Sequence, residues 1–117
     1  MPISAELIRG HLDAIILKLI LEKDRYGYEI AKEIAARTDH RLEIKEATLY
    51  AAIQRLERNK HIVSYSGMVT HGRARVYYKP TPGGRAYYRE KRAEWLTIKD
   101  VINQLLEDEQ DENQGIR

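Results

Sequence analysis

Small, polar and basic side chains are predicted to share one face of a helix in the middle of the chain, over residues 46–59. If Leu49 is placed at zero and each residue turns by about 100°, Ala52, Ile53 and Leu56 fall near it and form the buried side. The other side of the helix, together with the residue before it, carries Lys45, Thr48, Tyr50, Ala51, Gln54 and Arg55. Hydroxyl and cationic groups suit phosphate oxygens, whereas Gln, Arg and a small methyl group can read base edges. This face therefore predicts contact with double-stranded DNA.

Two neighbouring segments extend this candidate interface. Residues 67–74 form the tip of a predicted hairpin, where His71, Arg73 and the adjacent Arg75 can reach the DNA backbone or the minor groove. Tyr28 begins a predicted helix, whose free backbone amides favour a nearby phosphate. The alternative for any one of these side chains is an exposed polar position without a role, and it is their grouping that favours DNA.

The charge distribution is typical of a protein with a polyanionic partner. The 117 residues have a formal net charge of +2, but residues 107–117 hold five acids and one base. Residues 1–106 then carry 19 bases and 13 acids, and residues 54–92 alone contain ten bases and two acids. A segment this basic suits DNA. A solvated lysine and arginine surface is the alternative explanation.

The sequence lacks the patterns of catalytic and metal-binding sites. Its four histidines have no metal-ligand spacing, its serines have no G-x-S-x-G context, and its paired glycines have no phosphate-loop residues around them. It contains no cysteine, which excludes disulfides and thiolate metal sites and favours a reducing compartment. We therefore expect no enzyme activity, no metal and no cofactor.

A location in the cytoplasm is expected from the same sequence. No run of about 18 apolar residues is present, so the chain is not expected to span a membrane. Its first residues, MPISAE, lack the basic and then apolar layout of a signal peptide.

The elements that position these residues are predicted from apolar spacing. Helices are expected over about 4–22, with Ser4 as its N-cap, and over about 28–37, before the helix over 46–59. Two runs rich in β-branched and aromatic residues, 62–66 and 75–79, predict a hairpin. The expected fold class is mainly α with a small β-hairpin, in the order of a winged helix-turn-helix.

A last helix is predicted from about residue 82 to residue 108, with Thr81 as its N-cap and Pro82 at its first position. Its apolar positions Trp95, Ile98, Ile102 and Leu105 follow a heptad-like spacing, which predicts a dimer interface. The expected organisation is a DNA-binding domain over 1–81, a dimerisation helix over 82–108 and an acidic flexible tail over 109–117.

Trp95 has two interpretations. As the only tryptophan of the chain, in a core-like position of the last helix, it can simply pack in an interface between subunits. It can also provide a flat surface on which an aromatic ligand stacks. The residues alone leave both open.

Five segments together resemble the PadR family of bacterial regulators. They read LDAIIL at 12–17, YGYEI at 26–30, EATLY at 46–50, GRARVYY at 72–78 and TPGG at 81–84. The resemblance extends from about residue 7 to residue 106, and the order and spacing of the segments make it specific. The short single C-terminal helix is similar to that of the small subfamily, which includes multidrug-sensing members.

The resemblance implies a homodimer in which the C-terminal helix docks on the partner's N-terminal helix. It also implies a repressor that binds a pseudo-palindromic operator, with two recognition helices in successive major grooves about 34 Å apart. Thr48 and Tyr50 match family positions at the start of the recognition helix, and Arg73 and Arg75 match the wing. Phenolic acids or flat hydrophobic drugs release some members from DNA, which implies an aromatic effector.

The resemblance also implies where an effector binds. Trp95 matches a tryptophan that sandwiches planar ligands between subunits. The candidate ligand-binding residues are Leu7, Asp13, Ala14, Trp95, Leu96 and Lys99. Drug-sensing members have an acid one turn after the tryptophan, where this chain has Lys99, so a preference for cationic drugs is not implied. Asp13 either restores a negative charge to the pocket or pairs with Lys99.

Three functional hypotheses remain at this point. The first is a dimeric repressor released by a planar aromatic or phenolic molecule. The second is a repressor that binds DNA without any effector, in which Trp95 only packs. The third is a winged-helix module that binds another protein, against which the basic helix face and the arginine-rich hairpin argue.

Overall fold

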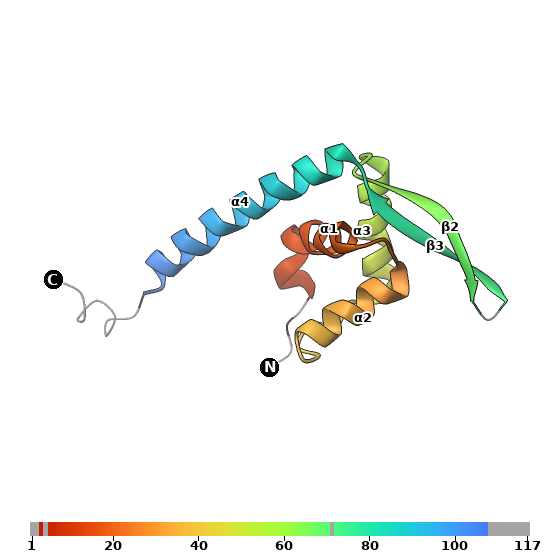
Figure 1. The fold of residues 1–117 in the computed structure, drawn as a ribbon. Helices are drawn as coiled ribbons and strands as arrows, with labels where there is room; N and C mark the ends of the chain where they lie inside the picture. Colours follow the sequence, from red (N-terminus) through yellow and green to blue (C-terminus); the bar gives the residue numbers. More distant parts are fainter. Residues whose placement is uncertain (1–2, 4, 71, 108–117) are drawn as a thin grey trace.

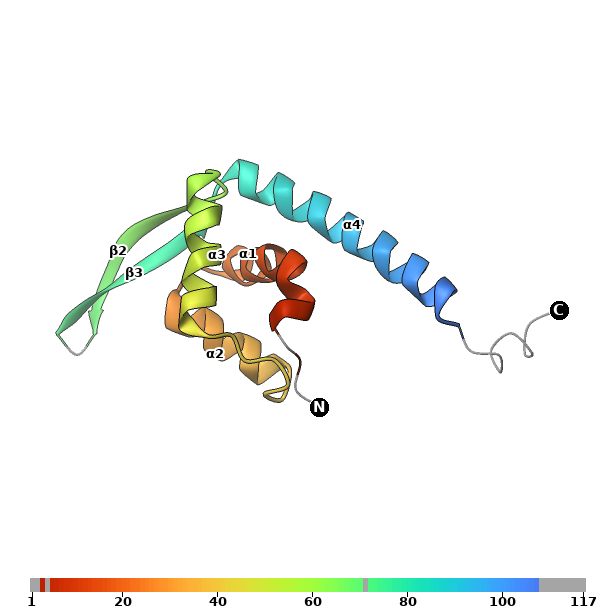
Figure 2. The same ribbon diagram turned by 180° about the vertical axis from the view of Figure 1, so that it is seen from behind.

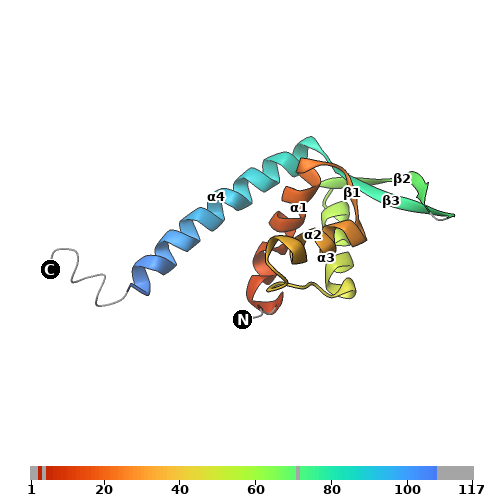
Figure 3. The same cartoon turned by 60° about the horizontal axis from the view of Figure 1, so that its bottom comes forward.

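The computed structural model describes residues 3, 5–70 and 72–107 and, apart from one short additional strand, has the predicted order of helices and strands (Figure 1). The elements are the 3-10 helix η1 (Ala5–His11), α1 (Leu12–Glu22), β1 (Arg25–Tyr26), α2 (Gly27–Arg37), α3 (Glu46–Arg58), β2 (Ile62–Thr70), β3 (Arg73–Pro80) and α4 (Pro82–Leu105). The predicted fold class is confirmed. Its helices α1, α2 and α3 lie together, and the hairpin and α4 extend from them in opposite directions (Figures 2 and 3).

Several elements differ from the predictions. Strand β2 extends to Thr70 rather than to 66 and β3 begins at Arg73 rather than at 75, so most of the predicted tip over 67–74 belongs to the strands. The first helix is not a continuous α-helix, because its first turns up to His11 are a 3-10 helix. The short strand β1 was not predicted, since two residues are too few for an alternating pattern. Helix α4 ends at Leu105 rather than at 108. The predicted N-cap Ser4 lies outside the described residues.

The hydrophobic core lies where α1, α2 and α3 meet. The large side chains that are almost completely buried come from these three helices and from the first residue of β2: Ile16, Leu17, Ile20, Ile30, Leu49, Ile53, Leu56 and Ile62. The face of α3 predicted to be buried is therefore confirmed, and its burial fixes which side of the helix is left for solvent.

Strand β3 is central in a three-stranded antiparallel sheet of order β1-β3-β2. Its last residues pair with the start of β2, as in Val63 opposite Lys79, and Tyr77 pairs with Tyr26 of β1. The register between β2 and β3 shifts between Ser66 and Val69. Gly67 lies in this irregular stretch, where a Cβ atom would overlap the ring of Tyr77. The long hairpin is thus joined to the helices through β1, which leads directly into α2.

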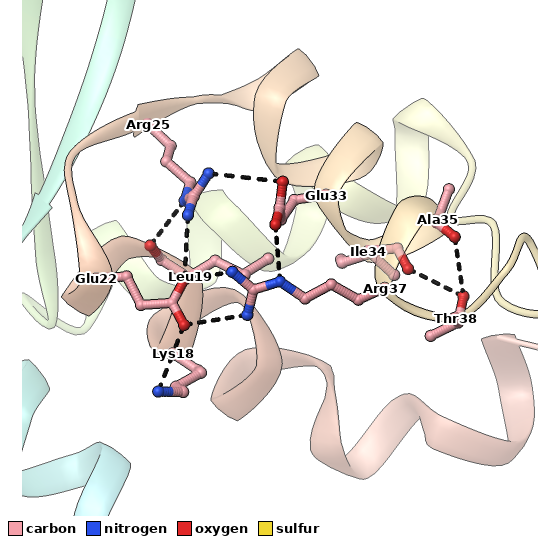
Figure 4. A network of polar contacts seen from close by, with 9 residues as sticks. All are labelled: Lys18, Leu19, Glu22, Arg25, Glu33, Ile34, Ala35, Arg37 and Thr38. Carbon is pink, nitrogen blue, oxygen red and sulfur yellow. Dashed lines mark hydrogen bonds and ion pairs between the residues drawn. The ribbon is translucent and has the colours of Figure 1, made fainter.

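A network of ion pairs holds α2 on the end of α1 (Figure 4). Arg37 of α2 donates to Glu22 of α1 at 2.5 and 3.0 Å and to Glu33 at 2.8 Å. Arg25 is buried and donates to Glu22 at 3.0 Å and to the carbonyl oxygen of Leu19 at 2.9 Å. The hydrogen bonds from Arg37 are the largest cause that lowers the pKa of Glu22 to about 2. The same guanidinium lowers the pKa of Glu33.

These lowered pKa values predict that the folded protein becomes less stable at acidic pH. A carboxyl group with a lower pKa in the folded than in the unfolded protein stabilises the fold above its unfolded pKa, and this stability is lost as the pH falls. For Glu22 the loss is expected between about pH 4.5 and pH 2. Urea unfolding at pH 7 and pH 3 should show a smaller difference in Arg37→Gln than in the wild type. An equal difference in both proteins would contradict the assignment of the shift to Arg37.

Helix α4 begins at a cap that the sequence predicted. The Oγ1 atom of Thr81 accepts a hydrogen bond from the amide of Gly84 at 2.9 Å, and Pro82 occupies the first position. The same hydroxyl donates to the carbonyl oxygen of Lys60 at 2.8 Å, which anchors the start of α4 to the end of α3. Gly84 is buried against the backbone of His61, and a Cβ atom there would overlap the His61 carbonyl oxygen.

Replacement of Gly84 should therefore destabilise the protein. In Gly84→Ala the added methyl group meets backbone rather than a movable side chain, so α4 must shift, at a cost of about 2 kcal/mol in the free energy of unfolding. The matched control is Gly83→Ala, whose Cβ would lie 3.6 Å from its nearest neighbour, the Oγ1 atom of Thr81. The control should change stability by less than about 1 kcal/mol, in either direction. Equal urea midpoints for both variants would contradict the close approach.

Candidate nucleic-acid interface

The side of α3 opposite the core is exposed and carries most of the side chains predicted to contact DNA. Thr48, Ala51 and Gln54 are exposed on this helix, and Lys45 is exposed immediately before it. Glu46 is the only acidic residue in its first turn, and Arg55 and Arg58 lie in its last. The exposed face is small and polar at its centre, so a groove of DNA can approach it closely.

Two tyrosines join α3 to the start of α2. Tyr28 is 64% exposed at the N-terminal end of α2, where its hydroxyl can reach a phosphate. Tyr50, by contrast, is only half-exposed, and its ring and hydroxyl lie against Gly27 so closely that a Cβ atom there would overlap them. Tyr50 therefore packs the recognition-helix candidate α3 on α2, in addition to any contact its hydroxyl makes with DNA.

The base of the hairpin is an aromatic cluster. The guanidinium of Arg75 lies 4.5 Å from the centre of the Tyr26 ring, which contacts Tyr77 edge to face at 5.5 Å. Tyr77 stacks on Tyr65 at 5.8 Å, and the Tyr65 hydroxyl donates to Asp24 at 2.5 Å, which raises the pKa of Tyr65 to about 12. These contacts join the hairpin to Asp24 and Tyr26, just before α2. Arg75 is thus partly occupied by a cation–π contact.

The two candidates at the tip of the hairpin remain predictions. His71 lies outside the described residues, and the side chain of Arg73 is not described either.

Arg55 differs from the other candidates on α3 because its side chain is turned toward α1. Its Nη2 and Nε atoms donate to the two carboxylate oxygens of Asp13 at 2.6 and 3.3 Å. Asp13 is therefore bonded to α3 and is not among the residues that line the groove described next. The alternative prediction of a pair between Asp13 and Lys99 does not match this arrangement.

A surface groove of about 590 Å³ runs between α1, the end of α2 and α4. Of the predicted ligand-binding residues, Ala14, Trp95, Leu96 and Lys99 line it, whereas the side chain of Leu7 is not described. Ile15 of α1 is half-buried and also lines the groove. The ring of His11 meets Trp95 edge to face, with ring centres 4.9 Å apart.

Basic side chains surround this groove. Lys18, Arg37, Lys91, Arg92 and Lys99 line it, and no acidic side chain is among the described lining residues. Of these five, only Lys99 was predicted from the sequence. Their helical spacing was a usable signal, because residues 91, 95 and 99 lie one turn apart and therefore share a face of α4.

The distal half of α4 has an apolar face that the other described residues leave exposed. Leu105 and Leu106 are 77% and 73% exposed, and Trp95 and Ile102 are exposed to 42% and 44%. Ile98 is half-buried. Contiguous apolar surface of this kind marks an interaction site.

Neither a metal site nor a membrane-spanning helix is found in the described part of the chain. Within residues 3, 5–70 and 72–107, no group of three or more His, Cys, Asp or Glu side chains is arranged to hold a metal ion. None of the helices described there is both long and apolar enough to cross a membrane.

Comparison with known proteins agrees with this geometry. Residues 16–90 match the model of a family described as the transcriptional regulator PadR-like family. An uncharacterized protein of Lysinibacillus sphaericus is 52% identical over 105 residues, which cover 90% of this chain and 96% of that protein.

Solved structures are similar as well. A transcriptional regulator from Clostridium thermocellum is 50% identical, with a TM-score of 0.82 over 90% of this chain and 99% of that one. A PadR family transcription regulator from Clostridium difficile is 39% identical, with a TM-score of 0.72 over 83% and 99% of the two chains.

Proposed function

Because the chain belongs to the PadR-like family of transcriptional regulators, which bind DNA and are not enzymes, we propose that it is a dimeric repressor that reads a pseudo-palindromic operator with α3 and the hairpin. The observation that carries this proposal is the exposed face of α3, which is polar, compact and flanked by Tyr28. As a regulator of transcription it would act in the cytoplasm.

Each part of the interface has its own task in this proposal. Gln54 and Ala51 read base edges in the major groove, while Lys45, Thr48, Tyr28 and the Tyr50 hydroxyl bind phosphates. His71, Arg73 and Arg75 on the hairpin contact the backbone or the minor groove beside the recognition helix. Residues 1–81 would thus form the DNA-binding domain.

The second subunit would be bound through residues 82–108. The apolar end of α4, with Ile102 and Leu105, is exposed among the described residues and needs a cover. The groove along α1 offers apolar surface of the same kind. Two copies that exchange their α4 helices would cover both surfaces, and such an isologous pairing would set the distance between the two α3 helices.

We further propose that the groove at Trp95 takes a planar aromatic effector between the subunits. Of the bases that line it, Lys18, Arg37 and Lys91 are ion-paired with glutamates. The other two, Arg92 and Lys99, favour an anionic or neutral compound over a cation. An effector can release DNA only if it binds more tightly to a dimer whose α3 spacing does not fit the operator. A repressor without an effector, in which Trp95 only packs, is the alternative.

DNA binding is tested by fluorescence anisotropy of a duplex from the chain's own upstream region and of a scrambled duplex, over a series of salt concentrations. A repressor should prefer the upstream duplex, and its affinity should fall steeply with salt. Equal binding to both duplexes without salt dependence would reject an operator at that site. It would favour the module that binds another protein.

The effector is tested on the same complex with a matched pair of probes, 2-naphthoate and its neutral amide. Release of DNA together with a change in Trp95 fluorescence would support the groove as the effector site, and a stronger effect of the carboxylate would support the role of its bases. No effect of either probe on DNA or on fluorescence would favour the repressor without an effector.

A further inference from the structure

Helix α3 is tied to α1 by an ion pair that has two hydrogen bonds. The guanidinium of Arg55 bonds both carboxylate oxygens of Asp13, at 2.6 and 3.3 Å. The Asp13 side chain is only 16% exposed, although Arg55 is 43% exposed. Because both groups are planar, two bonds fix their relative orientation as well as their distance.

The direction of Arg55 separates it from the residues proposed to read DNA. On a helix that turns by about 100° per residue, Arg55 lies about 100° from Gln54, on the side of α3 that faces α1. The carboxylate of Asp13 is the largest cause that raises the pKa of Arg55, and the nearby Tyr87 of α4 adds to it. The charge of Arg55 is therefore already compensated within the protein.

A move of Arg55 toward DNA would have a cost. It would leave the mostly buried carboxylate of Asp13 without the partner that compensates its desolvation. Lys45 has no such partner among the described residues, and its side chain is exposed. Among the described residues, Arg55 near the end of α3 is thus ion-paired, whereas Lys45 just before its start is not.

Resting on the DNA-binding function proposed above, we propose that Asp13 and Arg55 are positioning residues that fix the rotation of α3 on α1 and contact neither DNA nor effector. Base reading needs side chains placed to within a fraction of an ångström, whereas binding to phosphates tolerates more displacement. Loss of the pair should therefore weaken binding to the operator more than binding to a scrambled duplex.

The two possible roles of Arg55 predict opposite results for its partner. If Arg55 positions α3, Asp13→Asn and Arg55→Gln should each weaken operator binding, by about tenfold, and leave binding to the scrambled duplex unchanged. The salt dependence should stay that of the wild type. The double variant should be no worse than either single variant, since the two residues act as one unit.

A phosphate contact by Arg55 would give the reverse pattern. Arg55→Gln would then reduce the slope of log affinity against log salt by about 0.9 for each phosphate that the protein no longer neutralises. Asp13→Asn would strengthen binding, because it removes a carboxylate that competes for the guanidinium. Lys45→Gln is the comparison variant, for which this reduction of the slope is expected. That pattern in Arg55→Gln would overturn the proposal.

Hydrogen exchange of the free protein tests the pair without DNA. In Asp13→Asn and in Arg55→Lys, which keeps the charge but loses the fork, amides of α3 should exchange faster than in the wild type. Unchanged exchange in both variants would overturn the proposal even if the wild type binds DNA. A third result separates the two proposals. If the wild type shows no preference for the upstream duplex but the variants still exchange faster, the proposed function is rejected and the positioning role of Asp13 and Arg55 is retained.

Discussion

Ala51→Glu is expected to abolish specific DNA binding, with a loss of affinity of at least about a hundredfold. Ala51 is exposed at the centre of the polar face of α3, so a larger side chain does not disturb the core. In the complex, however, the new carboxylate would be placed against base edges and phosphates, and charges of the same sign in contact cost several kcal/mol. A loss of about 2.7 kcal/mol corresponds to a hundredfold change.

The control for this variant is the same change, alanine to glutamate, at a position outside the proposed interface. Ala36 is exposed near the end of α2, at the opposite end of that helix from Tyr28, and Ala36→Glu adds the same charge there. Anisotropy should show nearly unchanged binding for the control, and both proteins should unfold at the same urea concentration as the wild type. Equal losses in both variants would mean that net charge alone matters, and normal binding by Ala51→Glu would remove α3 from the interface.

The sequence was sufficient where local rules decide the structure. The apolar spacing of α3 defined its buried side, and thereby the exposed positions Thr48, Ala51 and Gln54, because a helix turns by a constant angle. The start of α4 followed from Thr81 and Pro82 for an equally local reason, the need to satisfy free amides.

Interactions between distant segments could not be predicted in this way. Arg55 and Asp13 are 42 positions apart, and nothing near either residue indicates that they bond. Helical spacing placed Arg55 near the exposed face, but its long side chain bends back to α1. In the same way, Tyr26 contacts Arg75 only because β1 pairs with β3, and two residues give no periodic signal.

The groove at Trp95 could be predicted from the sequence only in part. Its α4 wall could be predicted, since residues 91, 95 and 99 share a helix face. Its other wall comes from α1 and from Arg37, which at the same time bonds Glu22 and Glu33. A single arginine thus contributes both to the groove and to the contact between α1 and α2, and its place in the groove depends on the packing of three helices.

Ile102→Glu is expected to convert a dimer into a monomer without unfolding the protein. Ile102 is 44% exposed in the single chain and lies beside Leu105 and Leu106, which are exposed to more than two thirds. A carboxylate at this position stays in water in the monomer but would be buried without a partner in an interface formed by α4. Sedimentation equilibrium should give twice the mass of the chain for the wild type and the mass of one chain for the variant.

Gln104→Glu provides the matched control, because residue 104 is exposed and lies about 160° from Ile102 around α4. This variant should remain a dimer and keep its affinity for the operator, whereas Ile102→Glu should also lose operator affinity, since one subunit can contact only half of a pseudo-palindromic site. A monomeric wild type would reject the dimer. A dimer that survives Ile102→Glu would place the interface away from the distal half of α4, and the distance between the two α3 helices would then have to be set by another surface.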